Sequence, residues 1–170
     1  MKNKTVIILG SSRSDGNTRK IVETLVSLNT DFDVVDLNDY KIGYYDYNFE
    51  NRDDDFLELY KHLLEYDTLI FATPIYWYCM SAQLKTFFDR ISDVLYGDMK
   101  AYGRKLRGKS MAVISCSSGA DKIKGFTMPF KETAKYLGMT YKGYVHTWVE
   151  PDHTLDKKVN KALKDFLEKI

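Results

Sequence analysis

TVIILGSSRSDGNTRKIVETLV, residues 5–26, joins a buried strand to an amphipathic helix and thereby decides the fold. The first five residues form a continuous apolar run, which is typical of a strand buried on both faces of a sheet. Ile21, Val22, Leu25 and Val26 then recur at helical spacing. Residues 10–18, the first loop, therefore lie between a strand and a helix, and they are small, polar and rich in hydrogen-bond donors.

Two interpretations of the first loop remain open from the residues alone. A helix N-terminus offers unpaired N–H groups and a partial positive charge, so the loop could hold a phosphate. Alternatively, Asn17 or Thr18 caps the helix and Gly16 supplies a turn. Two known nucleotide-binding motifs are absent. The nucleoside-triphosphate motif GxxxxGK(S/T) requires Lys after its second Gly, but Asn17 follows Gly16, and the dinucleotide motif GxGxxG does not occur. For the phosphate site, Gly10, Ser11, Ser12 and Gly16 are small enough to let backbone amides approach an anion, Ser11, Ser14, Asn17 and Thr18 add donors, and Arg13 can add a charge.

Strand and helix patterns alternate along the rest of the chain. Apolar runs recur at residues 32–37, 67–74, 109–118 and 139–148. Helical spacing of apolar residues recurs at 21–26, 56–64, 84–94, 128–137 and 155–170. Five strands alternating with five helices predict an α/β protein whose parallel sheet is covered on both faces. The length of 170 residues predicts a single domain over residues 1–170.

Charge and composition exclude several classes of function. There are 25 Lys and Arg residues against 24 Asp and Glu, which gives a formal net charge of +1 and no strong field toward nucleic acid or an anionic membrane. We expect no signal peptide and no membrane span. Two cysteines cannot form a disulfide framework, so we expect a cytoplasmic protein. The three histidines lack metal-ligand spacing, so no metal is expected.

Parallel sheets of this kind bind ligands at the carboxyl ends of their strands, which directs attention to two further loops. After the third strand, an aromatic cluster could line a cleft and stack on a flat ring, although such clusters are more often core. After the fourth strand, SCSSGAD could turn backbone N–H groups toward the polar edge of that ring. The candidate residues are Pro74, Ile75, Tyr76 and Trp77 in the second loop (residues 74–79) and Ser117, Ser118 and Gly119 in the third loop (residues 117–121).

Other features near these loops carry weaker expectations. Ser81 is expected to start the helix after the second loop, where Lys85 and Asp89 are spaced for a surface ion pair. The long connection at residues 38–52 is rich in tyrosine, and its length is more typical of a functional loop or lid than of a plain connector. Cys79 and Cys116 fall near the expected ring, where either could have a redox role, although small buried thiols are far more common.

Two motifs carry a resemblance to a known family. GSSRSDGNT after the first strand and TPIYWYCMSAQLKTFFDR after the third resemble the flavodoxin-like NAD(P)H-dependent FMN reductases, which include quinone and azo-compound reductases. The resemblance implies a three-layer α/β/α fold with strand order 2-1-3-4-5, bound FMN, and NADPH or NADH as co-substrate. It also implies a homodimer and a small electron acceptor, such as a quinone, flavin, azo or nitro compound.

The resemblance transfers residue by residue, with two departures. The resemblance places the second-loop and third-loop candidates along the ring of FMN. At its phosphate it places Ser11, Arg13, Gly16, Asn17 and Thr18. Ser12 stands where relatives often have Pro, and residues 38–52 hold no Cys for the iron–sulfur centre of some relatives. No side chain is expected to be catalytic, because the flavin carries the chemistry.

Two other functions are compatible with this fold. A flavodoxin-type electron carrier would hold FMN and pass single electrons to protein partners, but such carriers resemble one another in a Thr- and Gly-rich first loop and an acidic surface that this chain lacks. A binding or regulatory module without turnover is the second alternative.

Overall fold

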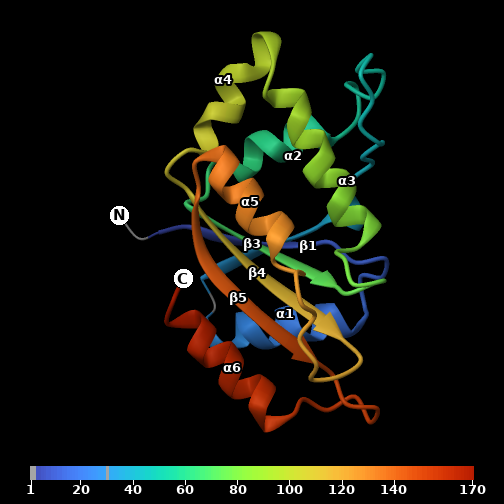
Figure 1. The fold of residues 1–170 in the computed structure, drawn as a ribbon, viewed down its shortest axis with the longest axis vertical. Helices are drawn as coiled ribbons and strands as arrows, with labels where there is room; N and C mark the ends of the chain where they lie inside the picture. Colours follow the sequence, from blue (N-terminus) through green and yellow to red (C-terminus); the bar gives the residue numbers. More distant parts are fainter. Residues whose placement is uncertain (1–2, 30) are drawn as a thin grey trace.

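The computed structural model describes residues 3–29 and 31–170 and shows one parallel sheet of five strands (Figure 1). The strand order β2-β1-β3-β4-β5 confirms the predicted order. Each predicted strand is present, with bounds within one residue of the apolar run that predicted it. The strands are β1 (Thr5–Leu9), β2 (Phe32–Asp36), β3 (Thr68–Pro74), β4 (Ser110–Ser117) and β5 (Thr140–Trp148).

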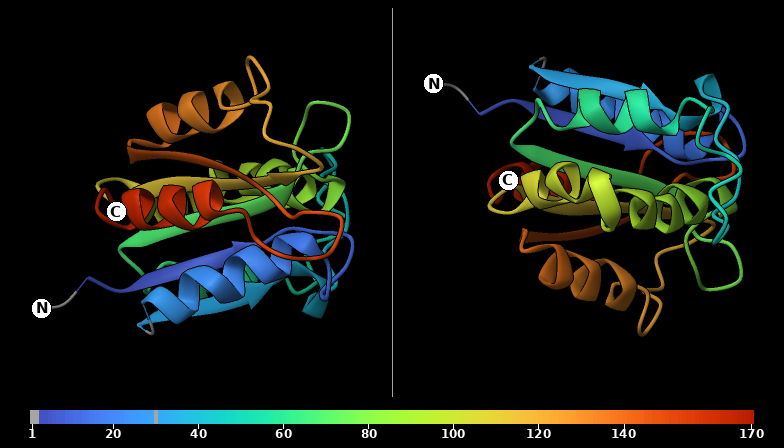
Figure 2. Two further views of the ribbon diagram at one scale, coloured as in Figure 1. Left: turned by 90° about the horizontal axis from the view of Figure 1, so that it is seen from below. Right: turned by 90° about the horizontal axis from the view of Figure 1, so that it is seen from above.

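Helices cover both faces of the sheet, which confirms the three-layer α/β/α architecture (Figure 2). One face packs against α1 (Asn17–Leu28) and α6 (Lys157–Leu167). The other packs against α2 (Phe56–Leu63), α3 (Ala82–Arg90) and α5 (Met128–Leu137). None of the helices in the described part of the chain is long and apolar enough to cross a membrane.

The continuous apolar runs follow from this double cover. Successive side chains of a strand point to opposite faces, so both sets are buried when helices lie on each side. In β1, Val6 and Ile8 belong to the core beneath α2, α3 and α5, whereas Ile7 and Leu9 belong to the core beneath α1 and α6.

The segment between α3 and β4 differs from the sequence prediction. Helical spacing of apolar residues continues to Val94, but α3 ends at Arg90 and residues Ile91–Val94 form a 3₁₀-helix, η2. Three more short turns, not predicted, lead to β4. They are η3 (Gly97–Met99), α4 (Lys100–Gly103) and η4 (Arg104–Leu106).

Arg90 fastens the tyrosine-rich connection to the end of α3. Its side chain is 2% exposed and donates hydrogen bonds to the carbonyl oxygens of Gly43 and Asn51, each at 2.9 Å. It also pairs with Asp54, and with Asp93 at 2.7 Å. Burial opposes ionisation of Asp54, but hydrogen bonds from Arg90 and from two backbone amides outweigh it and lower the pKa of Asp54. Arg90 therefore holds the connection at two of its residues, Gly43 and Asn51, against the C-terminal end of α3.

Candidate functional site

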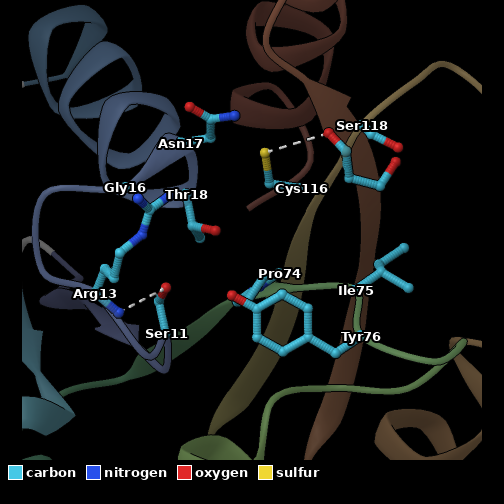
Figure 3. A pocket seen from close by; sticks show the side chains of 11 residues that line it. Ser11, Arg13, Gly16, Asn17, Thr18, Pro74, Ile75, Tyr76, Cys116 and Ser118 are labelled. Carbon is cyan, nitrogen blue, oxygen red and sulfur yellow. Dashed lines mark hydrogen bonds between the residues drawn. The ribbon is translucent and has the colours of Figure 1, made fainter.

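A pocket of about 280 Å³ opens at the carboxyl ends of β1, β3 and β4, and it contains ten of the twelve predicted site residues (Figure 3). The remaining two, Trp77 and Gly119, line an adjoining cavity of about 340 Å³ between the second and third loops. Ile75, Ser117 and Ser118 border both spaces. The structure thus brings all three predicted loops together. The ten in the first pocket are Ser11, Arg13, Gly16, Asn17, Thr18, Pro74, Ile75, Tyr76, Ser117 and Ser118.

The first loop presents an uncapped helix N-terminus to the pocket. Gly16 is the N-cap of α1, and no side chain accepts a hydrogen bond from the first turn. The prediction that Asn17 or Thr18 merely caps this helix is therefore wrong. The reason is geometric: both residues lie inside the helix, one and two positions after the cap, where their side chains cannot turn back onto the first N–H groups. Those donors remain available to an anion.

Ser81 and Gly10 hold the first loop against α3. The Ser81 hydroxyl donates to the Gly10 carbonyl oxygen at 2.7 Å and accepts from the Leu84 amide at 3.2 Å, which confirms Ser81 as the N-cap of α3. Gly10 is required for this close approach, because an added Cβ would lie 2.6 Å from Leu84 Cβ. The start of α3 thus fixes the height of the first loop above the sheet.

Asn38 supports the same loop from the other side. Its side-chain amide donates to the Ser11 carbonyl oxygen at 2.8 Å and to Ser14 Oγ at 3.2 Å. This is the start of the connection at residues 38–52, which otherwise runs along α3 and contributes no lining residue to the pocket or to the adjoining cavity. In the structure, residues 38–52 therefore do not form a lid over the pocket of the same chain.

The second loop is a tight turn that turns its aromatic side chains outward. Tyr76 and Cys79 exchange two backbone hydrogen bonds of 3.0 Å around Trp77 and Tyr78, whose φ angles are +47° and +67°. Positive φ at both central residues corresponds to a type I′ turn, which usually contains Asn and Gly. Trp77 is 92% exposed. The alternative that this cluster is core is therefore wrong for its aromatic members.

Tyr76 links the second loop to the first. Its hydroxyl lies 3.1 Å from Ser12 Oγ, so the phenol spans one side of the pocket. Pro74 pairs in register with Cys116, and the Ile75 amide donates to the Cys116 carbonyl oxygen at 2.8 Å. The second loop is thereby joined to the strand that carries the third loop, and the walls of the pocket are mutually fixed.

The third loop closes the pocket with small polar residues. The Ser117 hydroxyl donates to the Gly119 carbonyl oxygen at 2.9 Å and accepts from the Gly119 amide at 3.3 Å. Cys116, beneath it, also lines the pocket (Figure 3). Burial raises the pKa of the Cys116 thiol to about 11, so this side chain is a neutral thiol at physiological pH. A redox role through its thiolate is therefore disfavoured.

The chemistry of the site suits an anionic tail joined to a flat head. The pocket of about 280 Å³ offers three kinds of donor: the Arg13 side chain, the free N–H groups of α1, and the hydroxyl groups of Ser11 and Thr18. No acidic side chain among the described residues lines this pocket. Beside them, Ile75, Tyr76 and Trp77 offer apolar and aromatic surface. No cluster of three His, Cys, Asp or Glu in the described part of the chain is placed to hold a metal ion.

Comparison with known proteins assigns the family. The model of the NADPH-dependent FMN reductase family matches residues 3–153. The chain belongs to this family. The expectation from the two sequence motifs is thus confirmed, and the FMN reductase family is one of oxidoreductases that use a nicotinamide cofactor and FMN.

Individual relatives agree with the family assignment. The chain is 34% identical over 154 residues to YwqN of Bacillus subtilis, whose name describes an NAD(P)H-dependent FMN-containing oxidoreductase. The match covers 84% of this chain and 83% of YwqN. It is 31% identical over 173 residues to an iron–sulfur flavoprotein of Archaeoglobus fulgidus, covering 94% of this chain and 75% of that protein.

Solved structures agree on the fold of this chain. A Trp repressor binding protein from Bacillus subtilis is 28% identical with a TM-score of 0.78, covering 98% of this chain and 99% of that chain. An FMN-dependent NADH-azoreductase from Bacillus anthracis, solved with FMN, is 15% identical with a TM-score of 0.66, covering 98% and 97%. At that identity the likeness concerns the fold alone.

Several residues that shape the site were not recognised from the sequence. Ser81 carries a helix-start signal, but its bond to Gly10 does not follow from that signal. Asn38, Arg90 and His146 carry no local signal for the contacts described above. Their bonds to Ser11, Gly43 and Gly119 span 27, 47 and 27 residues of the chain.

Proposed function

We propose that this protein is an FMN-dependent oxidoreductase that takes hydride from NADPH or NADH and passes it to a small acceptor. The observation that carries the proposal is the uncapped N-terminus of α1 in a pocket shared with the second and third loops. A phosphate would complete the hydrogen bonds of that terminus, and membership of the FMN reductase family supports FMN as its bearer.

The residues present fit this cofactor. Ser11, Arg13, Gly16, Asn17 and Thr18 would hold the phosphate, because they combine a cation, hydroxyl groups and free backbone donors. The ring would lie along Pro74, Ile75, Tyr76 and Trp77, with Ser117, Ser118 and Gly119 at its polar edge. The two adjoining cavities of about 280 Å³ and 340 Å³ are of the size that binds small molecules and cofactors.

The protein's contribution to the reaction is placement. FMN, when bound, supplies a centre that accepts hydride from a nicotinamide and delivers electrons to an acceptor. The phosphate of FMN would meet no repelling charge from the described residues in the pocket of about 280 Å³. The Cys116 thiol is neutral, and no acidic side chain in the described part of the chain lines this pocket. The second loop holds its aromatic side chains outward, so the space beside it is open to flat molecules from solvent.

Because a nicotinamide and an acceptor would use the same open space in turn, we propose ping-pong kinetics. Quinones, flavins, azo compounds and nitro compounds are flat enough to enter it. Solved structures of this fold include an NADPH-quinone reductase from P. pentosaceus and the FMN-dependent azoreductase, so the fold is one that reductases of such compounds use.

We further propose that the protein acts in the cytoplasm as a homodimer. Both cysteines are free, as a reducing compartment requires. The exposed Trp77, Tyr78 and Tyr44 are large aromatic side chains that a second copy could cover. Analytical ultracentrifugation with and without FMN tests the assembly, and a monomer in both conditions contradicts it.

Anaerobic mixing of the FMN-loaded protein with NADPH, and separately with NADH, tests the function. Loss of the oxidised flavin absorbance within seconds, followed by its return on adding a quinone, is the expected result. A protein that keeps FMN but stays yellow would instead be a flavodoxin-type carrier. A protein that takes up no FMN would contradict both functions.

A further inference from the structure

His146 is a buried histidine on β5 whose ring contacts both the neighbouring strand β4 and the third loop. Its ring is 4% exposed and lies between Tyr144 and Trp148, with ring centroids 6.5 Å and 6.3 Å away. It pairs in register with Ser115 on β4, whose hydroxyl lies 2.9 Å from its Nδ1. Its other nitrogen, Nε2, lies 2.9 Å from the carbonyl oxygen of Gly119.

These contacts determine which nitrogen carries the proton. A carbonyl oxygen only accepts hydrogen bonds, so the contact with Gly119 requires the proton on Nε2. In the neutral ring Nδ1 is then an acceptor. The Ser115 hydroxyl, at 2.9 Å, is nearer to it than the Tyr144 hydroxyl, at 3.4 Å, so we assign Ser115 as the donor. The Tyr144 hydroxyl, 2.7 Å from Ser115 Oγ, completes the series by donating to that oxygen. Burial raises the pKa of Tyr144, so its phenol keeps this proton at neutral pH.

The series therefore runs in one direction, from Tyr144 through Ser115 and His146 to the Gly119 carbonyl. That carbonyl also accepts from Ser117 Oγ at 2.9 Å, so two donors draw it toward the sheet. A trans peptide holds its C=O and the next N–H on opposite sides of one plane. Turning the Gly119 oxygen toward β5 consequently turns the Ala120 N–H away from it, and this exposed amide makes no backbone hydrogen bond among the described residues.

We propose that His146 is a positioning residue that sets the orientation of the Gly119–Ala120 peptide, and with it the donors that the third loop presents to the flavin ring. This proposal rests on the proposed function, because it assigns a purpose to the third loop. Steric demands do not explain the loop conformation: an added Cβ at Gly119 would meet nothing within 4 Å, and Gly119 is absent from the glycines with positive φ.

Two substitutions separate the roles of the two ring nitrogens. In H146Q the side-chain amide reaches the position of Nε2 and can still donate to Gly119. In H146N the amide ends near the position of Nδ1, so it can meet Ser115 but not Gly119. We expect H146Q to keep FMN affinity within about twofold, whereas H146N weakens it by roughly threefold to tenfold, as the loss of one hydrogen bond implies.

Y144F is the matched control within the same series. It removes the first hydroxyl but leaves the contact between His146 and Gly119 in place, so FMN affinity and the visible spectrum of bound flavin should match those of the wild type. Thermal unfolding of each apoprotein shows whether a variant is folded before its FMN affinity is measured by fluorescence titration.

A second measurement needs no flavin. The ¹⁵N shifts of the neutral His146 ring in the apoprotein should report a proton on Nε2 and an unprotonated Nδ1. The Nδ1–H tautomer would overturn the proposal, and so would equal FMN affinity in folded H146Q and H146N. If the wild type itself fails to bind FMN, the proposed function fails, and the tautomer then shows whether the structural part of the inference stands.

Discussion

The Ser81 hydroxyl donates a 2.7 Å hydrogen bond to the carbonyl oxygen of Gly10, so the residue that caps α3 also holds the end of β1. The two residues are 71 positions apart in the chain. Neighbouring Leu84 contacts Gly10 so closely that no side chain fits there. The height of the first loop above the sheet is thus set by the close contact of Gly10 with α3.

Gly10→Ala should destabilise the apoprotein by about 1–3 kcal/mol, the usual cost of overpacking a filled site. The new Cβ would lie 2.6 Å from Leu84 Cβ, so either α3 or the first loop must move. Gly119→Ala is the matched control, because nothing lies within 4 Å of its added Cβ. Urea unfolding measures both. Equal stability of the two variants would show that α3 adjusts freely.

Arg90→Met should destabilise the protein by about 3–5 kcal/mol, the range for breaking a buried ion pair. The substitution leaves Asp54 and Asp93 without their cation and the carbonyl oxygens of Gly43 and Asn51 without a donor. Lys85→Met on the same helix is the control, since the exposed pair of Lys85 with Asp89 is worth at most about 1 kcal/mol. Similar losses in the two variants would contradict a special role for Arg90.

The same ion pair predicts a dependence of stability on pH. The folded state lowers the pKa of Asp54 from its ordinary value of 3.8. The stabilisation is therefore fully present above that value and is lost as the pH falls through the lowered pKa. The difference in unfolding free energy between the wild type and Asp54→Asn should shrink between pH 6 and pH 3. A difference that is constant over this range would show that Asp54 is not held ionised.

Replacing Asn17 and Thr18 together by Ala should weaken FMN binding. Each lost hydrogen bond is worth roughly 0.5–1.5 kcal/mol, and more if it reaches the charged phosphate. Thr24→Ala, further along the same helix, is the control. It should bind FMN like the wild type, because the Thr24 hydroxyl donates to the Lys20 carbonyl oxygen of its own helix. Unchanged flavin affinity in a folded double variant would refute the phosphate site.

The turn at Trp77 and Tyr78 should be more stable as Asn-Gly. Both residues adopt positive φ, which costs an ordinary side chain about 1–2 kcal/mol. W77N/Y78G should therefore raise the free energy of unfolding of the apoprotein by about 1 kcal/mol. It should also change the fluorescence of bound flavin, whereas Trp77→Phe keeps an aromatic ring there. A loss of stability would mean that Trp77 packs on the protein in solution.

The layers and the outline of the site could be predicted from the sequence because they depend on local patterns. Continuous apolar runs mark doubly covered strands, and parallel strands bring their carboxyl ends to one edge, so the loops after Leu9, Pro74 and Ser117 had to meet. What could not be predicted depends on distant partners. Nothing near Arg90 indicates that it bonds to Gly43, 47 residues earlier, and nothing near Trp77 suggests a left-handed turn, which usually contains Gly or Asn.

The pocket draws its walls from residues 11–18, 74–76 and 116–118, so it belongs to no continuous stretch of the chain. During synthesis the ribosome must release β4 before the last wall exists. FMN can consequently bind only after β4 has been synthesised and paired. A truncated chain that stops short of β4 lacks the third wall of the pocket and should not retain flavin. Flavin content per polypeptide would thus report the fraction of molecules whose synthesis and strand pairing are complete.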